Sequence, residues 1–154
     1  MSQVLQRLTD LGFELPRFNT KGGNYAMFKR YGNLIYTAGQ VSLENDVLLY
    51  RGTVGVDLDI EAAQAAAQVC ALNLIAIANA ACDGDLDRIR VMKVNGYVKC
   101  LPAFEQQAKV LDGASNFFMS VFGEERGSHA RAAVGVSALP RGAPVEVEAV
   151  FVID

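Results

Sequence analysis

Alternating and helical patterns of apolar residues follow one another along the chain and predict most of its elements. Strict alternation over Ile89–Cys100 is typical of a half-buried strand. The alanine-rich stretch after Asp59 has its apolar residues at helical spacing, with Asp59 as the N-cap and Asp83-Gly84-Asp85 as the stop. A second helix is expected from Pro102 to about Phe122. The pattern therefore indicates helices that alternate with strands.

Shorter runs predict the remaining elements. Residues 25–31 and 34–38 are β-rich and flank Gly32-Asn33, which favours a hairpin. Residues 19–24 are expected to form a loop, residues 47–56 a third strand, residues 124–128 a loop, and residues 2–14 a short helix ended by Pro16. The order predicts one α+β domain over residues 1–154, with 1–16 as a helical extension. A mixed sheet of about six strands would be packed by two helices in two layers.

The last quarter of the chain, residues 129–153, carries charges on strand-like segments. Two alternating runs flank a Pro/Gly turn and predict a β-hairpin. Arg131 enters the first run, opposite a presumed core row of small apolar residues (Ala130, Ala132, Val134 and Val136). Glu146 and Glu148 share one face of the second run. This pattern is typical of a site that binds a small carboxylate and moves protons.

Each of these charges has a plainer alternative. Arg131 either binds a carboxylate through two parallel N–H donors or forms a surface or interface ion pair with a glutamate. The two glutamates are either functional or solvated strand residues, and Glu148 could balance a cation across an interface. No nucleophilic serine or cysteine is expected beside a base, so covalent catalysis has no support.

Composition narrows the class of protein. The net charge is −3 and no basic run is longer than Lys29-Arg30, which argues against a nucleic-acid surface. The apolar stretch over 60–82 is interrupted by amides and rich in alanine, so a buried helix is expected rather than a membrane span. The N-terminus lacks the apolar core of a signal peptide, which predicts a cytoplasmic protein. Cys70, Cys82 and Cys100 are expected to be reduced thiols, with no metal site and no cofactor.

Four segments, in order, carry a family resemblance. They are Gly23-Asn24-Tyr25 followed by Gly32-Asn33, the strand Leu34-Ile-Tyr-Thr-Ala-Gly-Gln40, the helix with Ala66, Ala67 and Asn73, and the C-terminal stretch in which Arg131 precedes a Leu-Pro pair and Val-Glu-Val-Glu-Ala. Together they cover nearly the whole chain and resemble the Rid family, the RidA-like reactive enamine and imine deaminases. This resemblance implies a chorismate-mutase-like α+β fold, a homotrimer with pockets between subunits, and no cofactor.

The resemblance also implies roles for individual residues in the hydrolysis of 2-imino or enamino acids to 2-keto acids and ammonia. Arg131 would bind the substrate carboxylate and Glu146 would position water. The substrate-binding positions would be Tyr25, Ala38, Gly39, Asp112, His129 and Ala133. Thr37 and Gln40 would shape the same wall of the pocket, and the phenylalanines at 104, 117, 118 and 122 are expected to pack in the core.

Four positions depart from the family pattern. Ala133 replaces a common Cys, Ala38 a Ser, His129 a Pro, and Asp112 an Asn. His129 either lines the pocket or is an uninvolved loop residue, and Tyr25 either covers the pocket or lies at its rim. These departures leave a second hypothesis open, a trimer that binds or senses a keto acid without catalysis. Ribonuclease activity is disfavoured by the low basic charge and the lack of a histidine pair, and a chaperone-like trimer is a further alternative.

Overall fold

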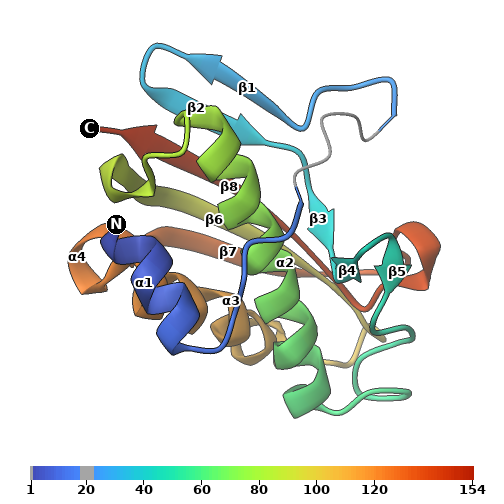
Figure 1. Cartoon of the computed structure of the whole chain (residues 1–154). Helices are drawn as coiled ribbons and strands as arrows, with labels where there is room; N and C mark the ends of the chain where they lie inside the picture. Colours follow the sequence, from blue (N-terminus) through green and yellow to red (C-terminus); the bar gives the residue numbers. More distant parts are fainter. Residues whose placement is uncertain (1, 18–22) are drawn as a thin grey trace.

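The computed structural model describes residues 2–17 and 23–154 and shows an α+β arrangement in which helices cover one face of a mixed sheet (Figure 1). The loop expected at 19–24 therefore lies mostly outside the described residues. The helices are α1 (Gln3–Asp10), α2 (Ile60–Ala81), α3 (Gln107–Phe122) and α4 (Glu124–Gly127), with short 3-10 turns η1 (Leu86–Arg88) and η2 (Pro140–Gly142). The strands are β1 (Phe28–Tyr31), β2 (Leu34–Thr37), β3 (Gln40–Val41), β4 (Leu43–Glu44), β5 (Val47–Leu48), β6 (Ile89–Lys99), β7 (Ala130–Val136) and β8 (Val145–Ile153).

Six strands form the main sheet, in the order β1-β2-β8-β6-β7, with β3 also paired to β8. The predicted hairpin around Gly32-Asn33 is confirmed, because β1 and β2 pair antiparallel with Tyr31 opposite Leu34. Strand β6 is an inner strand that pairs antiparallel with β8 and parallel with β7. The sheet is thus mixed, as the sequence predicted.

The predicted hairpin over 129–153 is wrong. Strands β7 and β8 lie on opposite sides of β6 and do not pair with each other. The eight intervening residues, 137–144, contain the turn η2 but do not join the two strands as a hairpin. They cross the end of β6, where the Lys99 N–H donates to the Pro144 carbonyl and the Cys100 N–H to the Val136 carbonyl. Two strand-like runs on either side of a turn can thus each pair with a third strand and not with each other.

The proposed core row on the first of these runs is also wrong. Ala130, Ala132 and Val134 are exposed, while the Arg131 side chain reaches α3. The reason lies in the parallel register, in which Arg131 is opposite Val94, a fully buried residue that faces the helices. Partners in register point to the same side of a sheet, so the helix side receives the guanidinium.

The helix layer packs closely on the sheet because small residues permit it. The N-cap at Asp59 is confirmed, since its side chain accepts from the Ala62 N–H. A Cβ at Gly113 would collide with the main-chain oxygen of Gln64, so α2 and α3 meet at backbone contact there. Helix α2 is long and apolar enough to cross a membrane by composition, but its alanines and leucines line the core. The phenylalanines at 117, 118 and 122 are buried in this core, as expected.

Several element boundaries differ from the prediction. Only Val47 and Leu48 of the expected 47–56 strand are in a strand, because Gly52 and Gly55 have positive φ and Asp57 accepts from the Thr53 N–H in a tight turn. The second helix begins at Gln107, since residues 101–104 form a separate turn. The first helix ends at Asp10, where Gly12 is left-handed, and α4 replaces the loop expected at 124–128.

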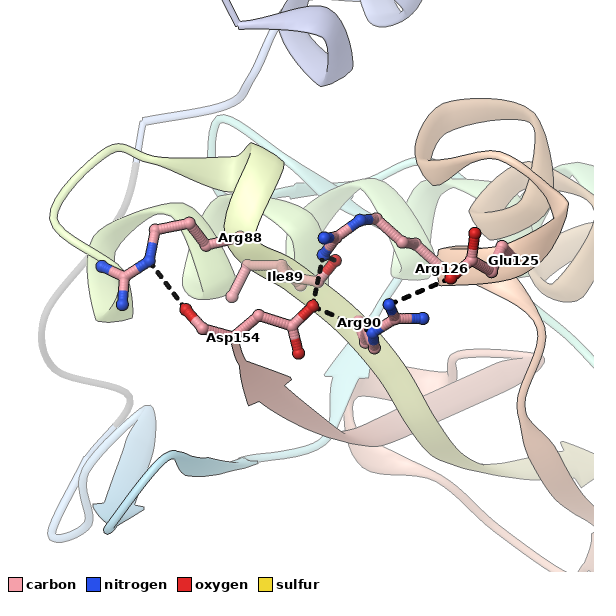
Figure 2. Close-up of polar contacts among 6 residues, drawn as sticks. All are labelled: Arg88, Ile89, Arg90, Glu125, Arg126 and Asp154. Carbon is pink, nitrogen blue, oxygen red and sulfur yellow. Dashed lines mark hydrogen bonds and ion pairs between the residues drawn. The ribbon is translucent and has the colours of Figure 1, made fainter.

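The end of β8 is held by three arginines around Asp154 (Figure 2). Its carboxylate lies 3.0 Å from both Arg90 Nε and Arg126 Nη1, and its main-chain oxygen accepts from Arg88 Nε at 2.9 Å. Arg90 also contacts Glu125 at 3.1 Å. These contacts connect β8, β6 and α4 at the end of the sheet away from residues 137–144.

Candidate functional site

Arg131 is the centre of a polar cluster between β7 and α3. Its Nη1 donates to Asp112 Oδ1 at 2.9 Å and to Ser115 Oγ at 3.0 Å, and its Nη2 donates to the Ala108 carbonyl at 3.2 Å. The side chain is 22% exposed and that of Asp112 is 48% exposed. Arg131 therefore does form an ion pair, but with an aspartate of its own chain rather than with the glutamate considered above.

His129 extends this cluster through Ser115. Its Nδ1 lies 2.6 Å from the Gly127 carbonyl oxygen, which identifies Nδ1 as the protonated nitrogen of the neutral ring. Its Nε2 is then an acceptor for the Ser115 hydroxyl at 2.9 Å. Burial lowers the pKa of His129, and the Arg131 charge lowers it further, while the bond to Gly127 opposes them. We name Arg131, Asp112, Ser115 and His129 the arginine cluster.

Ser115 was missed by sequence reasoning. The statement that no serine stands beside a base is wrong, because Ser115 Oγ contacts both His129 and Arg131. One signal was available: Ser115 follows Asp112 by three residues, so both side chains lie on one face of a helix. His129 belongs to the cluster through its contact with Ser115, and its part in a substrate pocket stays a prediction. Ala133, two residues after Arg131 on β7, is half-buried and packs against the core.

Glu146 lies at a different place, on β8 opposite Val41 of β3. A Cβ at Gly39 would collide with Glu146 Oε1, so the missing side chain at Gly39 leaves the room that the carboxylate occupies. Burial raises the pKa of Glu146, and the nearby charge of Glu148 raises it further. Within the described ranges no side chain or main-chain group donates a hydrogen bond to Glu146, so its oxygens are available.

A cavity of about 620 Å³ adjoins Glu146. Its walls include Tyr25, Gly39 and Gln40, with an Arg141–Asp46 ion pair of 3.1 Å among the lining residues. Tyr25 is 59% exposed, and Ala38, next to Gly39, is partly buried. Sequence reasoning did not identify Arg141 or Asp46. We name Tyr25, Ala38, Gly39 and Glu146 the glutamate cluster.

Glu148 is held by neighbours on its own sheet. It accepts from the Tyr97 hydroxyl at 2.7 Å and from the Asn95 amide at 3.2 Å. The hydrogen bond from Tyr97 to Glu148 is the main cause that raises the pKa of Tyr97 to about 12. The described hydrogen-bond partners of Glu148 are thus neutral groups on β6, not the Arg or Lys that the sequence analysis considered.

The two clusters lie on opposite faces of one sheet. The β8 residues Val145 and Val147, on either side of Glu146, are buried under the helices, so the Glu146 side chain leaves from the other face. Arg131 pairs with Val94 and Glu146 with Tyr97, which are three residues apart along β6. With about 3.3 Å per residue and 4.8 Å per strand, the two Cα atoms are roughly 14 Å apart. A three- or four-carbon acid cannot reach both groups within one chain.

Few of the described residues could bind a metal ion or act as a reactive thiol. In residues 2–17 and 23–154, no set of three or more His, Cys, Asp or Glu side chains is arranged to hold a metal ion. The three cysteines are unpaired with one another, and burial raises the pKa of Cys70 and of Cys82. A raised pKa keeps a thiol protonated and unreactive.

Comparisons with known proteins agree with this fold. The profile of the family described as "YjgF/chorismate mutase-like, putative endoribonuclease" matches residues 5–147. Protein TCP17 of Trypanosoma cruzi is 43% identical over 154 residues, which are 99% of this chain and 95% of TCP17. The solved structure of Atu1372 from Agrobacterium tumefaciens, a protein of unknown function, is 45% identical, with a TM-score of 0.90 over 98% of this chain and 92% of that one.

RidA from the Antarctic bacterium Psychrobacter sp. PAMC 21119 is a more distant match, 26% identical with a TM-score of 0.62, covering 91% of this chain and 99% of RidA. The fold is the chorismate-mutase-like α+β fold of two layers. The chain belongs to the YjgF/chorismate-mutase-like family, in which RidA is found, and the Rid resemblance is confirmed. Its backbone is nearer to that of Atu1372 than to that of RidA.

Proposed function

We propose that this protein hydrolyses small 2-imino acids to 2-keto acids and ammonia at sites formed between copies of the chain. One observation carries the proposal. A guanidinium with unused donors and a carboxylate with unused acceptors lie on opposite faces of the sheet, so that each is half of a site. A second copy that brings its glutamate cluster to the arginine cluster of the first would complete the chemistry.

The arginine cluster would hold the substrate. A guanidinium has five N–H groups, of which Nη1 uses two and Nη2 one in this chain. In the described residues nothing accepts from Nε or from the remaining N–H of Nη2. Nε and Nη2 are neighbours on the planar group, so these two N–H groups can donate to the two oxygens of a carboxylate. Asp112, Ser115 and the Ala108 carbonyl orient the group and leave two of its five N–H groups to a ligand.

The glutamate cluster would move the protons. Water adds to the carbon of the N-protonated imine: the C–O bond forms, the C=N π electrons move to nitrogen, and Glu146 accepts the proton that the water loses. Glu146 then gives this proton to the amine nitrogen of the carbinolamine, the C–N bond breaks with ammonia as the leaving group, and the hydroxyl oxygen forms the carbonyl as its proton returns to Glu146. A carboxylate whose pKa is raised by burial is a stronger base than a free one, and a pKa closer to neutral suits a group that both accepts and donates a proton.

The helix-free face of the sheet supports association. Tyr36 is 49% exposed and Val134 is 47% exposed on this face, beside partly exposed Val150 and Val152. Apolar side chains on an open sheet face are stabilised by burial against another copy. Together with the resemblance, this supports a homotrimer as the assembly that brings the two clusters together.

Retention of a ligand without turnover is the second candidate. Alanine stands at 38 and 133, so neither position offers a side-chain donor or nucleophile, whereas the guanidinium donors remain. The two candidates predict different results for the same ligand, because only the first releases ammonia.

Turnover of 2-iminopropionate, generated in the assay by an amino-acid oxidase acting on alanine, tests the proposal. We expect wild type to speed pyruvate formation above buffer, Arg131→Ala to lose this effect, and Arg30→Ala, at an exposed arginine of β1, to keep it. Equal rates for wild type and Arg131→Ala, or a wild-type rate equal to buffer, would contradict the proposal. If the wild-type rate equals that of buffer but the protein binds a keto acid, retention without turnover is the correct function. Cleavage of RNA would instead indicate the nuclease activity in the family's description.

A further inference from the structure

Asp112 changes the charge that the arginine cluster presents to a ligand. Its Oδ1 is 2.9 Å from Arg131 Nη1, so the pair carries no net charge. The resemblance places an Asn at this position, and an amide would leave the positive charge uncompensated. We propose that Asp112 makes the site selective for zwitterionic ligands, those with a cationic nitrogen next to a carboxylate, over simple carboxylate anions. This inference rests on the proposed carboxylate binding at Arg131.

The geometry leaves both charges of the pair accessible. Arg131 keeps two N–H donors without a partner in the described residues, and the Asp112 side chain is 48% exposed. Asp112 Oδ2 has no hydrogen-bond partner in the described ranges. A carboxylate on these Arg131 donors would therefore lie within a few ångströms of a carboxylate that still has an oxygen to offer.

The other members of the cluster do not supply charge. Ser115 is neutral, and the pKa of His129 is lowered by burial and by Arg131, which keeps the ring uncharged at neutral pH. The remaining Arg131 acceptor, at Ala108, is a main-chain carbonyl. The balance between ligand charges in this cluster thus depends on Arg131 and Asp112 alone among its members.

The substrate and the product of the proposed reaction differ in charge. A 2-imino acid protonated on nitrogen carries one positive and one negative charge, as does an α-amino acid. The 2-keto acid that forms from it is an anion. Asp112 attracts the cationic nitrogen of the first and repels the carboxylate of the second, so the substrate would be retained and the product released.

The experiment compares the binding of L-alanine and pyruvate, which share a three-carbon skeleton, by calorimetric titration of the full chain. The variants are Asp112→Asn, which removes charge at nearly constant shape, Asp85→Asn as a matched control at an exposed aspartate, and Arg131→Ala. A unit charge about 6 Å away in a partly solvated site changes affinity by roughly tenfold. We expect the ratio of the pyruvate Kd to the alanine Kd to fall about tenfold in Asp112→Asn and to stay constant in Asp85→Asn.

Two results would overturn the inference, and they differ. If both ligands bind wild type and Asp112→Asn leaves the ratio unchanged, Asp112 does not select by charge and carboxylate binding stands. If neither ligand binds wild type, or if Arg131→Ala binds both as well as wild type does, the carboxylate site itself is wrong. Circular dichroism of each variant verifies that the fold is retained.

Discussion

Two inactive variants should restore activity to each other if the site is shared between copies. Arg131→Ala removes the carboxylate anchor and leaves Glu146 in place, while Glu146→Gln does the reverse. The two positions are roughly 14 Å apart on opposite faces of the sheet, so no single chain can combine them. Each variant alone would have every site defective, and a mixed assembly would not.

The size of the recovery follows from the ring geometry. In a closed trimer that contains both variants, one junction always joins an intact Arg131 to an intact Glu146, whether the ratio is two to one or one to two. About one of three sites is then active, which predicts about one third of the wild-type rate per trimer. Sites formed within one chain would predict none.

Co-expression with two different affinity tags and purification over both isolates the mixed assemblies. The rate of 2-iminopropionate hydrolysis is then measured beside wild type and beside trimers of Arg131→Ala carrying both tags, which should be inactive. Mixed trimers without activity, although they are folded and of the correct mass, would refute the shared site. Recovery near the full wild-type rate would refute the count of one site per junction.

Three further predictions concern Gly39, Gly113 and Glu146. Gly39→Ala should displace the Glu146 carboxylate and lower kcat at least tenfold while the melting temperature changes little; an unchanged kcat would show that Glu146 is not held there. Gly113→Ala should force α2 and α3 apart and cost about 1–3 kcal/mol of unfolding free energy in a denaturant titration, whereas Asn116→Ala at an exposed position of α3 should not. Because the native pKa of Glu146 is raised, its ionisation opposes folding, and this penalty is absent below the unfolded-state pKa and full above the native one. Glu146→Gln should therefore raise the melting temperature at pH 7 and lose this advantage well below pH 4.5, and calorimetry at the two pH values would contradict the reasoning if the order were reversed.

Local patterns predicted the elements better than their pairing. The alternation over 89–100 and the Asp59 cap identified β6 and α2, because each depends on residues close in sequence. The partners of β7 and β8 depend on β6, which lies some thirty residues earlier than β7, and no local signal specifies that register. The prediction of which face of the sheet Arg131 occupies failed for the same reason.

Site residues could be proposed singly but not grouped from the sequence. The motif around Arg131 and Glu146 placed them on adjacent strand-like runs, which suggested a single pocket. The structure separates them into two clusters, because β6 lies between their strands and their side chains leave from opposite faces. The Asp112–Arg131 pair depends on how α3 packs beside β7, a tertiary contact that spacing alone does not reveal.

The hydrogen-bonded contact between His129 and Ser115 gives this protein a built-in spectroscopic probe. The chain has one histidine, so a proton NMR spectrum contains a single set of imidazole signals to assign. That ring is two hydrogen bonds away from the Arg131 guanidinium, through Ser115 Oγ. The chemical shifts of one side chain would therefore report, without labels or substitutions, when a ligand reaches the arginine.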